Sequence, residues 1–102
     1  MGVFDTITST HKNIEEDVVF QTKSFDKDMD EYKIEEDGFL YKKIVKDYTW
    51  MGKRSLGKFH KYFFDGLINF YTIIDYKRWI EYEALINDGV AYWIKKVNDE
   101  IL

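Results

Sequence analysis

The segment from Thr49 to Phe59 reads TWMGKRSLGKF and contains residue types that bind phosphate. Its two glycines give the backbone the freedom that an anion-binding loop needs, and the neighbouring side chains add cationic and hydroxyl donors. The donors are Lys53, Arg54, Ser55 and Lys58, and the rings of Trp50 and Phe59 can bracket a base by stacking. We interpret this segment as a candidate anion site, with a solvated basic loop between strands as the alternative.

The same segment does not predict an NTPase. Gly52 to Lys58 satisfies the spacing G-x-x-x-x-G-K, but Phe59 stands where a serine or threonine would reach magnesium. A P-loop also needs a buried parallel strand before it and a helix after it, whereas residues 59–71, FHKYFFDGLINFY, have the pattern of a hairpin. Phosphate binding without nucleotide hydrolysis is therefore the chemistry that remains.

Other reactive or metal-binding patterns are weak. The two histidines, His11 and His60, have no partner histidine at a metal-site spacing, and the chain has no cysteine. The acidic segment DKDMDEYKIEEDG lacks the glycine that a calcium loop has at its sixth position. Neither Ser24 nor Ser55 lies in a nucleophile elbow. We expect no metal, no cofactor and no enzymatic activity.

Length and composition predict a small folded protein. The chain has 102 residues, of which 45% are hydrophobic and 19% aromatic, so one domain spanning residues 1–102 can bury a modest core. No apolar run approaches the roughly 20 residues that span a bilayer, and no segment has the pattern of a signal peptide. We expect a cytoplasmic protein that does not associate with a membrane.

Charge is unevenly distributed along the chain. Residues 1–40 carry a net charge of −7, residues 41–61 a net charge of +6, and residues 62–102 a net charge of −3. The basic segment is either one half of an internal electrostatic match or an external anion site. General binding to nucleic acid is disfavoured, because the field of a chain with net charge −4 repels phosphates.

Three Asp-Gly pairs predict tight hairpin turns. They are Asp37-Gly38, Asp65-Gly66 and Asp88-Gly89, and each lies between runs that are rich in β-branched and aromatic residues. Residues 67–74 and 79–86 alternate as strands do. The alternation places Ile68, Phe70 and Ile74 on one face of the first strand, opposite Leu67, Asn69, Tyr71 and Ile73, and Ile80, Tyr82, Ala84 and Ile86 on one face of the second, opposite Glu81 and Glu83.

The remaining segments are less regular. Residues 18–23, VVFQTK, predict a strand, whereas residues 1–17 predict a loop or a short helix. Trp93, Val97 and Ile101 are four residues apart, so the last strand is expected to pass into a helical turn. The fold class is therefore α+β and β-rich, an antiparallel meander of hairpins with one or two short helices, and an all-β fold is the alternative. Large rings on both faces predict that a partner, a ligand or a second subunit covers one of them.

Several segments together resemble a known family. The start MGVFDTI, the segment FQTKSFDKDMDEYKIEEDGFL and the later segments DGLINFY and WIEYEALINDGVAYWI resemble small phage and prophage proteins, mostly of unassigned function. That family provides no catalytic residues, and the basic loop at residues 52–58 is not part of the resemblance. The resemblance implies a protein made in an infected bacterial cytoplasm.

These observations give three functional hypotheses. The first is a non-enzymatic phage-type inhibitor that binds a host protein, such as a bacterial defence effector, with its acidic faces mimicking nucleic acid or docking on a basic surface. The second is a protein that sequesters an anionic nucleotide, with Lys53, Arg54 and Lys58 on the phosphates. The third is a structural or assembly protein of a virion. We expect self-association to accompany any of them.

Overall fold

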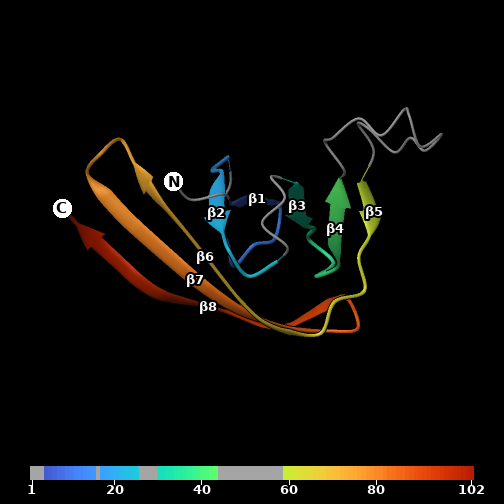
Figure 1. Ribbon diagram of the computed structural model, residues 1–102. Coiled ribbons are helices and arrows are strands. Elements are labelled where there is room, and N and C mark those ends of the chain that lie inside the picture. Colours follow the sequence, from blue (N-terminus) through green and yellow to red (C-terminus); the bar gives the residue numbers. More distant parts are fainter. Residues whose placement is uncertain (1–3, 16, 26–29, 44–58) are drawn as a thin grey trace, which may run out of the picture.

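The chain forms one eight-stranded mixed sheet, seen in a computed structural model that describes residues 4–15, 17–25, 30–43 and 59–102 (Figure 1). The order of the strands across the sheet is β5-β4-β3-β1-β2-β6-β7-β8. The strands are β1 (Asp5–Ser9), β2 (Phe20–Thr22), β3 (Glu31–Ile34), β4 (Leu40–Lys43), β5 (Phe59–Lys61), β6 (Gly66–Ile74), β7 (Arg78–Asn87) and β8 (Val90–Ile101). The β-rich prediction is therefore confirmed.

The described residues contain no helix, so the all-β alternative fits and the predicted short helices are not found there. A helix long and apolar enough to cross a membrane is accordingly not found in these ranges either. Six of the seven strand pairs in the described residues are antiparallel, whereas β1 and β3 pair in parallel. The sheet is thus two three-stranded meanders, β3 to β5 and β6 to β8, joined through β1 and β2.

Two of the three predicted hairpins are confirmed. Gly38 has a φ of 88° in the turn between β3 and β4, and Asp88 and Gly89 have φ of 52° and 79° in the turn between β7 and β8. Positive φ at both central residues gives the turn the twist that neighbouring strands need. The buried residues of β7 are also those that the alternation predicted, namely Ile80, Tyr82, Ala84 and Ile86.

The predicted hairpin at Asp65-Gly66 is wrong. β5 pairs with β4, whereas β6 pairs with β2 and β7, so the chain crosses between the two meanders at this point. The Asp65 side chain serves another turn, because its Oδ1 accepts a hydrogen bond of 2.6 Å from the Asp88 amide. The Phe64 carbonyl accepts a second hydrogen bond from the Gly89 amide at 3.1 Å. Asp65 and Gly66 therefore form a corner that supports the turn between β7 and β8.

The expectation of a loop or short helix over residues 1–17 is wrong for Asp5–Ser9, which form the interior strand β1. Its inward side chains are Asp5, Ile7 and Ser9, all buried. Ser9 Oγ donates to the Ile34 carbonyl at 2.8 Å, and Asp5 Oδ1 accepts from the Asp30 amide at 2.9 Å. Because two of the three inward residues are polar and satisfied by hydrogen bonds, hydrophobic periodicity could not reveal the strand.

The predicted helical turn at the end of the chain is also wrong, because β8 continues to Ile101. Two register shifts against β7, between Glu81 and Tyr82 and between Leu85 and Ile86, interrupt the alternation of β8. A bulge adds one residue to one strand and moves the residues after it to the other face. The spacing of four residues in β8 therefore reflects bulges in a strand.

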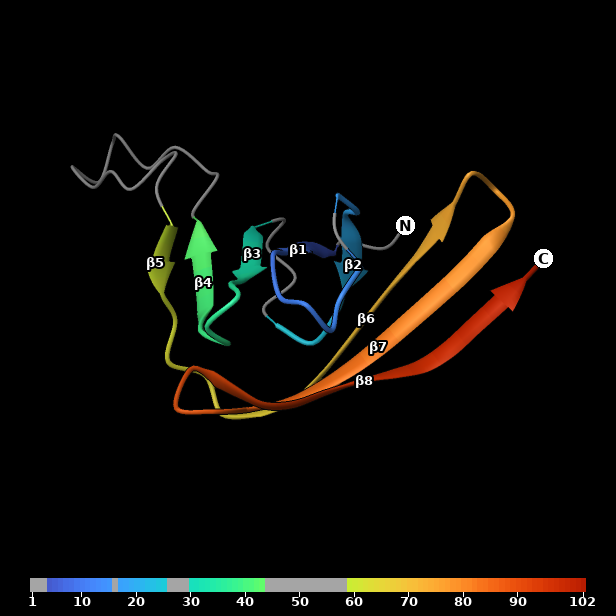
Figure 2. The same ribbon diagram turned by 180° about the vertical axis from the view of Figure 1, so that it is seen from behind.

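The sheet curls so that its inner face is buried against itself. Figures 1 and 2 show β3, β4 and β5 standing above the turn between β7 and β8, while β6, β7 and β8 extend away as an arm. Backbone hydrogen bonds close the curl, from the Leu40 amide to the Gly89 carbonyl at 2.8 Å and from the Ala91 amide to the Gly38 carbonyl at 2.8 Å. Rings fill the space inside, and Phe25 stacks on Tyr32 with their centroids 3.9 Å apart.

Replacing Gly89 by alanine should destabilise the protein more than replacing Gly38. A Cβ at Gly89 would lie 2.9 Å from the Tyr62 carbonyl oxygen, whereas a Cβ at Gly38 meets nothing closer than 3.8 Å. Gly38→Ala should cost roughly 1 kcal/mol, the conformational cost of a left-handed residue, and Gly89→Ala roughly 3 kcal/mol because overpacking adds to it. Urea unfolding of both variants measures the difference, and equal losses would contradict the closed turn.

Candidate functional site

Most of the sequence-predicted anion site lies outside the described residues. This applies to Trp50, Lys53, Arg54, Ser55 and Lys58, so their convergence stays a prediction. Phe59 is the exception, because it begins β5 and pairs with Lys43 of β4. The structure therefore shows only the surroundings of Phe59.

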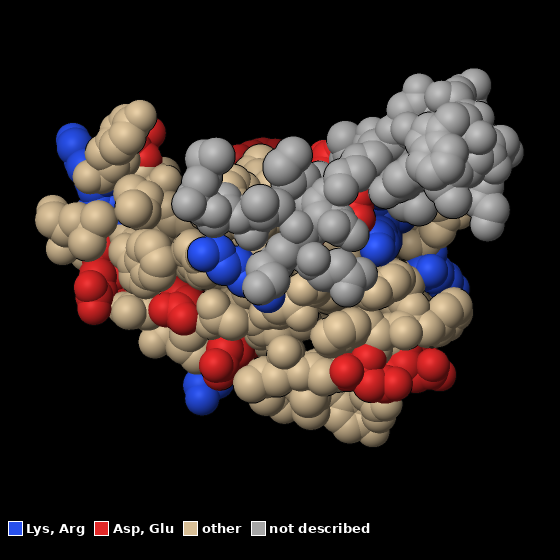
Figure 3. Space-filling model, viewed as in Figure 1, with Lys and Arg blue, Asp and Glu red and all other residues tan. Residues whose placement is uncertain are grey.

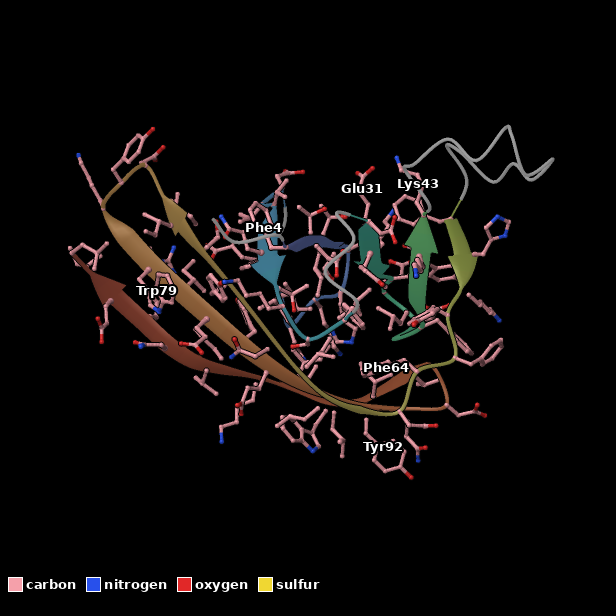
Figure 4. The ribbon with its side chains drawn as sticks, in the orientation of Figure 1. Phe4, Glu31, Lys43, Phe64, Trp79 and Tyr92 are labelled. Carbon is pink, nitrogen blue, oxygen red and sulfur yellow. The ribbon has the colours of Figure 1, made fainter. Side chains whose placement is uncertain are left out.

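Two lysines surround the Phe59 ring on the outer side of β3 and β4. Lys33 Nζ lies 5.7 Å and Lys43 Nζ 5.2 Å from the ring centroid. Lys43 Nζ is also 3.1 Å from Glu31 Oε2, and Figure 4 shows these two side chains together at the ends of their strands. Lys33 Nζ is likewise 3.3 Å from Glu35 Oε1, so two cations near the ring, each with a carboxylate beside it, make this a mixed ionic and aromatic cluster.

The third lysine of this region points inward. Lys42 Nζ is 3.6 Å from Asp30 Oδ2 and lies over the ring of Tyr62, 4.9 Å from its centroid. Asp30 is 5% exposed, so this ion pair belongs to the interior. Lys42 and Lys43 thus both pair with acidic residues of the first 40. For these two lysines, the basic segment is one half of an internal electrostatic match.

A different surface stands out on the outer face of β6, β7 and β8, which we define as the face opposite the buried residues of β7. Strand register sets its residues in cross-strand rows. The rows are Leu67, Leu85 and Trp93; Asn69, Glu83 and Lys95; Tyr71, Glu81 and Asn98; and Ile73, Trp79 and Glu100. Large apolar or aromatic side chains therefore lie at both ends of the face, and charged residues lie between them.

The apolar residues of this outer face are accessible. Leu67 is 52% exposed, Ile73 49% and Trp93 41%. Tyr71 and Trp79 stack with their ring centroids 5.1 Å apart, which fixes two large rings on adjacent strands. Figure 3 shows uncharged groups along the lower side of the molecule, with acidic groups and a basic group between them. Exposed apolar and aromatic side chains that gather on one face, here in two groups with charged residues between them, are a feature of protein-binding surfaces.

Tyr92 extends the accessible surface at the closed end of the sheet. It is 73% exposed and projects away from the body of the molecule (Figure 4). Ile86 of β7 lies opposite Ala91 of β8, and its neighbour Leu85 lies opposite Trp93. Tyr92 therefore has no partner on β7 and is the additional residue of a bulge in β8. A bulge can re-aim a side chain at the rim of a sheet. The large rings noted in the sequence therefore reach the surface here by an irregularity that alternation does not predict.

The perturbed titrating groups lie on the arm, on the inner side of β8. Arg78 Nε and Nη2 donate to the two carboxylate oxygens of Asp99 at 2.8 and 2.7 Å, and Arg78 Nη1 donates to Glu15 at 3.0 Å. Lys96 Nζ donates to Asp99 at 3.1 Å. The hydrogen bonds from Arg78 and then Lys96 hold the pKa of Asp99 well below its ordinary value, and Asp99 raises the pKa of Arg78 and of Lys96.

This ionic cluster has a structural role. It ties the end of β8 to the start of β7 and to the connection that contains Glu15, and its cations are matched by carboxylates. A bidentate arginine pair also fixes orientation, because two parallel hydrogen bonds define the plane of the guanidinium. Within the described ranges, no group of three or more histidine, aspartate or glutamate residues is placed to hold a metal ion.

Part of the outer face was predictable. Alternation correctly assigned Leu67, Tyr71 and Ile73 to the face opposite the buried residues of β6, and it placed Glu81 and Glu83 outside on β7. The neighbours on β8 were not predictable, because the bulges displace its residues. Comparisons with protein-family models, with curated proteins and with solved structures found no match to this chain.

Stability should depend on pH through Asp99. Its folded-state pKa is lowered from an ordinary value of 3.8, so its ion pairs stabilise the folded state above about pH 4 and are lost as the pH falls. Asp99→Asn should therefore be less stable than the parent at neutral pH, and the difference should shrink below pH 4. Denaturation at several pH values measures this. Glu36→Gln, in an exposed turn, is the control, and a constant difference for Asp99→Asn would contradict the linkage.

Proposed function

We propose that this protein is a non-enzymatic binding protein that docks on another protein through the outer face of β6, β7 and β8. The observation that carries the proposal is the row formed by Leu67, Leu85 and Trp93, which lies next to an open sheet edge and is partly exposed. Burying apolar surface of this kind contributes about 25 cal/mol per Å². Tryptophan, as at Trp93, is among the residues that most often anchor an interface.

The partner surface has a definite chemistry. The two apolar rows are six residues apart on β6, from Leu67 to Ile73, which is about 20 Å at the rise of a strand. Between them lie Glu81 and Glu83 of β7 and Lys95 of β8. A fitting partner presents apolar groups at both ends and polar or mainly basic groups between them. The dimensions are those of a protein surface, because a small ligand would contact only one row.

The partner that we propose is a host protein in a bacterial cytoplasm, and the effect of binding is inhibition. The support is the resemblance to small phage proteins in the segments quoted above, together with the acidic first 40 residues. A defence effector is the class of host protein for which a phage needs such an inhibitor. A role in virion structure or assembly is the alternative outcome of the same experiment.

Leu67→Arg should abolish capture of the partner and leave the fold intact. The residue is 52% exposed, so a long cation is tolerated there, but it would be buried and unpaired in the interface. The tagged protein and the variant are incubated with bacterial extract at low salt, and retained proteins are identified by mass spectrometry. Retention should fall at least tenfold, about 1.4 kcal/mol or more.

Glu36→Arg is the control, because Glu36 is exposed in the turn between β3 and β4, away from the outer face. It should retain the same protein as the parent. If the parent retains no host protein, or if both variants lose it equally, docking through the outer face is wrong. Retention of virion components instead of a host protein would favour the assembly role.

Nucleotide sequestration is the second candidate, and the position of Phe59 favours it. Its ring already lies near the cations of Lys33 and Lys43, and Phe59 directly follows the basic sequence segment in the chain. Native mass spectrometry of protein purified gently from bacteria should then show a bound nucleotide. The extra mass should disappear in the double variant Lys53→Glu with Arg54→Glu and persist in Lys23→Glu, an exposed control. Bare protein in every case would reject this candidate.

A further inference from the structure

The outer edge of β8 is open over most of its length. β8 pairs with β7 throughout, and its other edge is engaged only at its start, through the bridge between Phe39 and Val90 and the hydrogen bond from the Ala91 amide to Gly38. In the part of the chain that the structure describes, no strand pairs with the other edge of Trp93–Ile101. Figures 1 and 2 both show this edge on the outside of the arm. An unpaired strand edge presents backbone donors and acceptors to any strand that fits it.

The side chains along this edge form a self-complementary pattern. Two lysines, Lys95 and Lys96, are followed after two uncharged residues by two acids, Asp99 and Glu100. An antiparallel copy of the same strand reverses this order. When Val97 lies opposite Asn98 of the partner subunit, Lys95 therefore lies opposite Glu100 of the partner subunit, and Lys96 opposite Asp99 of the partner subunit.

The bulge at Val97 makes this alignment consistent with the two faces of the sheet. In a regular strand, residues five positions apart such as Lys95 and Glu100 point to opposite faces. Here the register shift makes both lie on the outer face, opposite Glu83 and Trp79 of β7. By the same shift Lys96 and Asp99 lie on the inner face, opposite Tyr82 and Ile80. Each lysine thus meets a carboxylate on its own face.

We propose that the partner for this edge is a second copy of the chain, paired antiparallel to β8 about a two-fold axis at Val97 and Asn98. The alignment forms four ion pairs, two on each face, and places Ile94 opposite Ile101 of the partner subunit. If the second strand is shifted by one residue in either direction, a lysine lies opposite an acid that points to the other face of the sheet. If it is shifted by two residues, both lysines lie opposite uncharged residues. One register therefore satisfies both charge and face.

The same features exclude other strands. Lysines and bulges on an edge strand are the usual means by which proteins prevent unwanted pairing. A foreign strand without an acid at the matching position would place no carboxylate opposite Lys95, whereas a second copy supplies Glu100 of the partner subunit there. Asp99 is already hydrogen-bonded to Arg78 and Lys96 of its own chain, so the inner pairs extend an existing cluster. The outer pairs from Lys95 to Glu100 of the partner subunit are new contacts and decide the association.

Charge exchange at the outer pair tests the proposal. The protein should sediment as a dimer that weakens with salt, since its contacts are partly exposed. Lys95→Glu alone and Glu100→Lys alone should each be at least about tenfold weaker in self-association, because two like-charge contacts replace two attractive ones. An equimolar mixture of the two variants should recover a heterodimer, in which every outer pair is again opposite in charge.

The controls are Lys23→Glu and Glu36→Lys, which change the net charge equally at exposed sites away from β8. Both should dimerise like the parent, and circular dichroism confirms that all variants are folded. A monomeric parent overturns the proposal, as does a dimer that neither variant weakens or a mixture that does not recover association. Assemblies larger than two would contradict a two-fold pairing, which closes after two copies. This outcome is independent of host-protein capture, because self-association is measured on the purified chain.

Discussion

The contact between β2 and β6 joins the two halves of the sheet, and the shape of the molecule depends on it. Its register is short, with Gln21 opposite Tyr71 and Thr22 opposite Phe70. Side chains reinforce it, because Thr22 Oγ1 donates to the Asn69 carbonyl at 2.6 Å, and the Phe20 ring packs edge-on against Phe70 at 5.3 Å. Because β2 and β6 pair over only two positions, the two halves of the sheet can bend sharply relative to each other. A longer strand pair would keep them in one smoothly twisted sheet.

That bend determines which surfaces are buried and which remain available. Without a helix in the described residues to cover the sheet, its inner face can exclude water only by curling on itself, and rings from both meanders fill the interior. The curl closes through Gly38 and Gly89 at one end of β7 and β8. The other end projects as an arm, so the outer face of β6 to β8 and the edge of β8 stay exposed. The proposed binding surfaces follow from this geometry.

Local signals in the sequence predicted the elements whose causes are local. The turns at Gly38 and Gly89 need positive φ, and the strand from Ile80 to Ile86 alternates cleanly, so both were predictable. Where a residue works through distant contacts, the prediction failed. Asp65 has the sequence context of a turn residue, but its side chain accepts a hydrogen bond from the amide of Asp88 in another turn. The burial of β1 was missed because two of its inward side chains are polar and are hydrogen-bonded. Of the predicted anion site, only Phe59 lies in the described residues, and its lysine neighbours on β3 and β4 come from strand register.

The outer face and the edge of β8 share one strand, which links the two proposed interactions. Trp93 belongs to the apolar row of the outer face, and Lys95 and Glu100 lie on the same face along the edge. Two copies paired through β8 would therefore present two outer faces side by side in one continuous surface, related by the two-fold axis. A partner with repeated subunits could engage both faces at once, and its apparent affinity would exceed that of either face because the second contact is intramolecular. A partner with a single site would gain nothing from the pairing. The symmetry of the target, more than the area of one face, would then determine how strongly this protein binds.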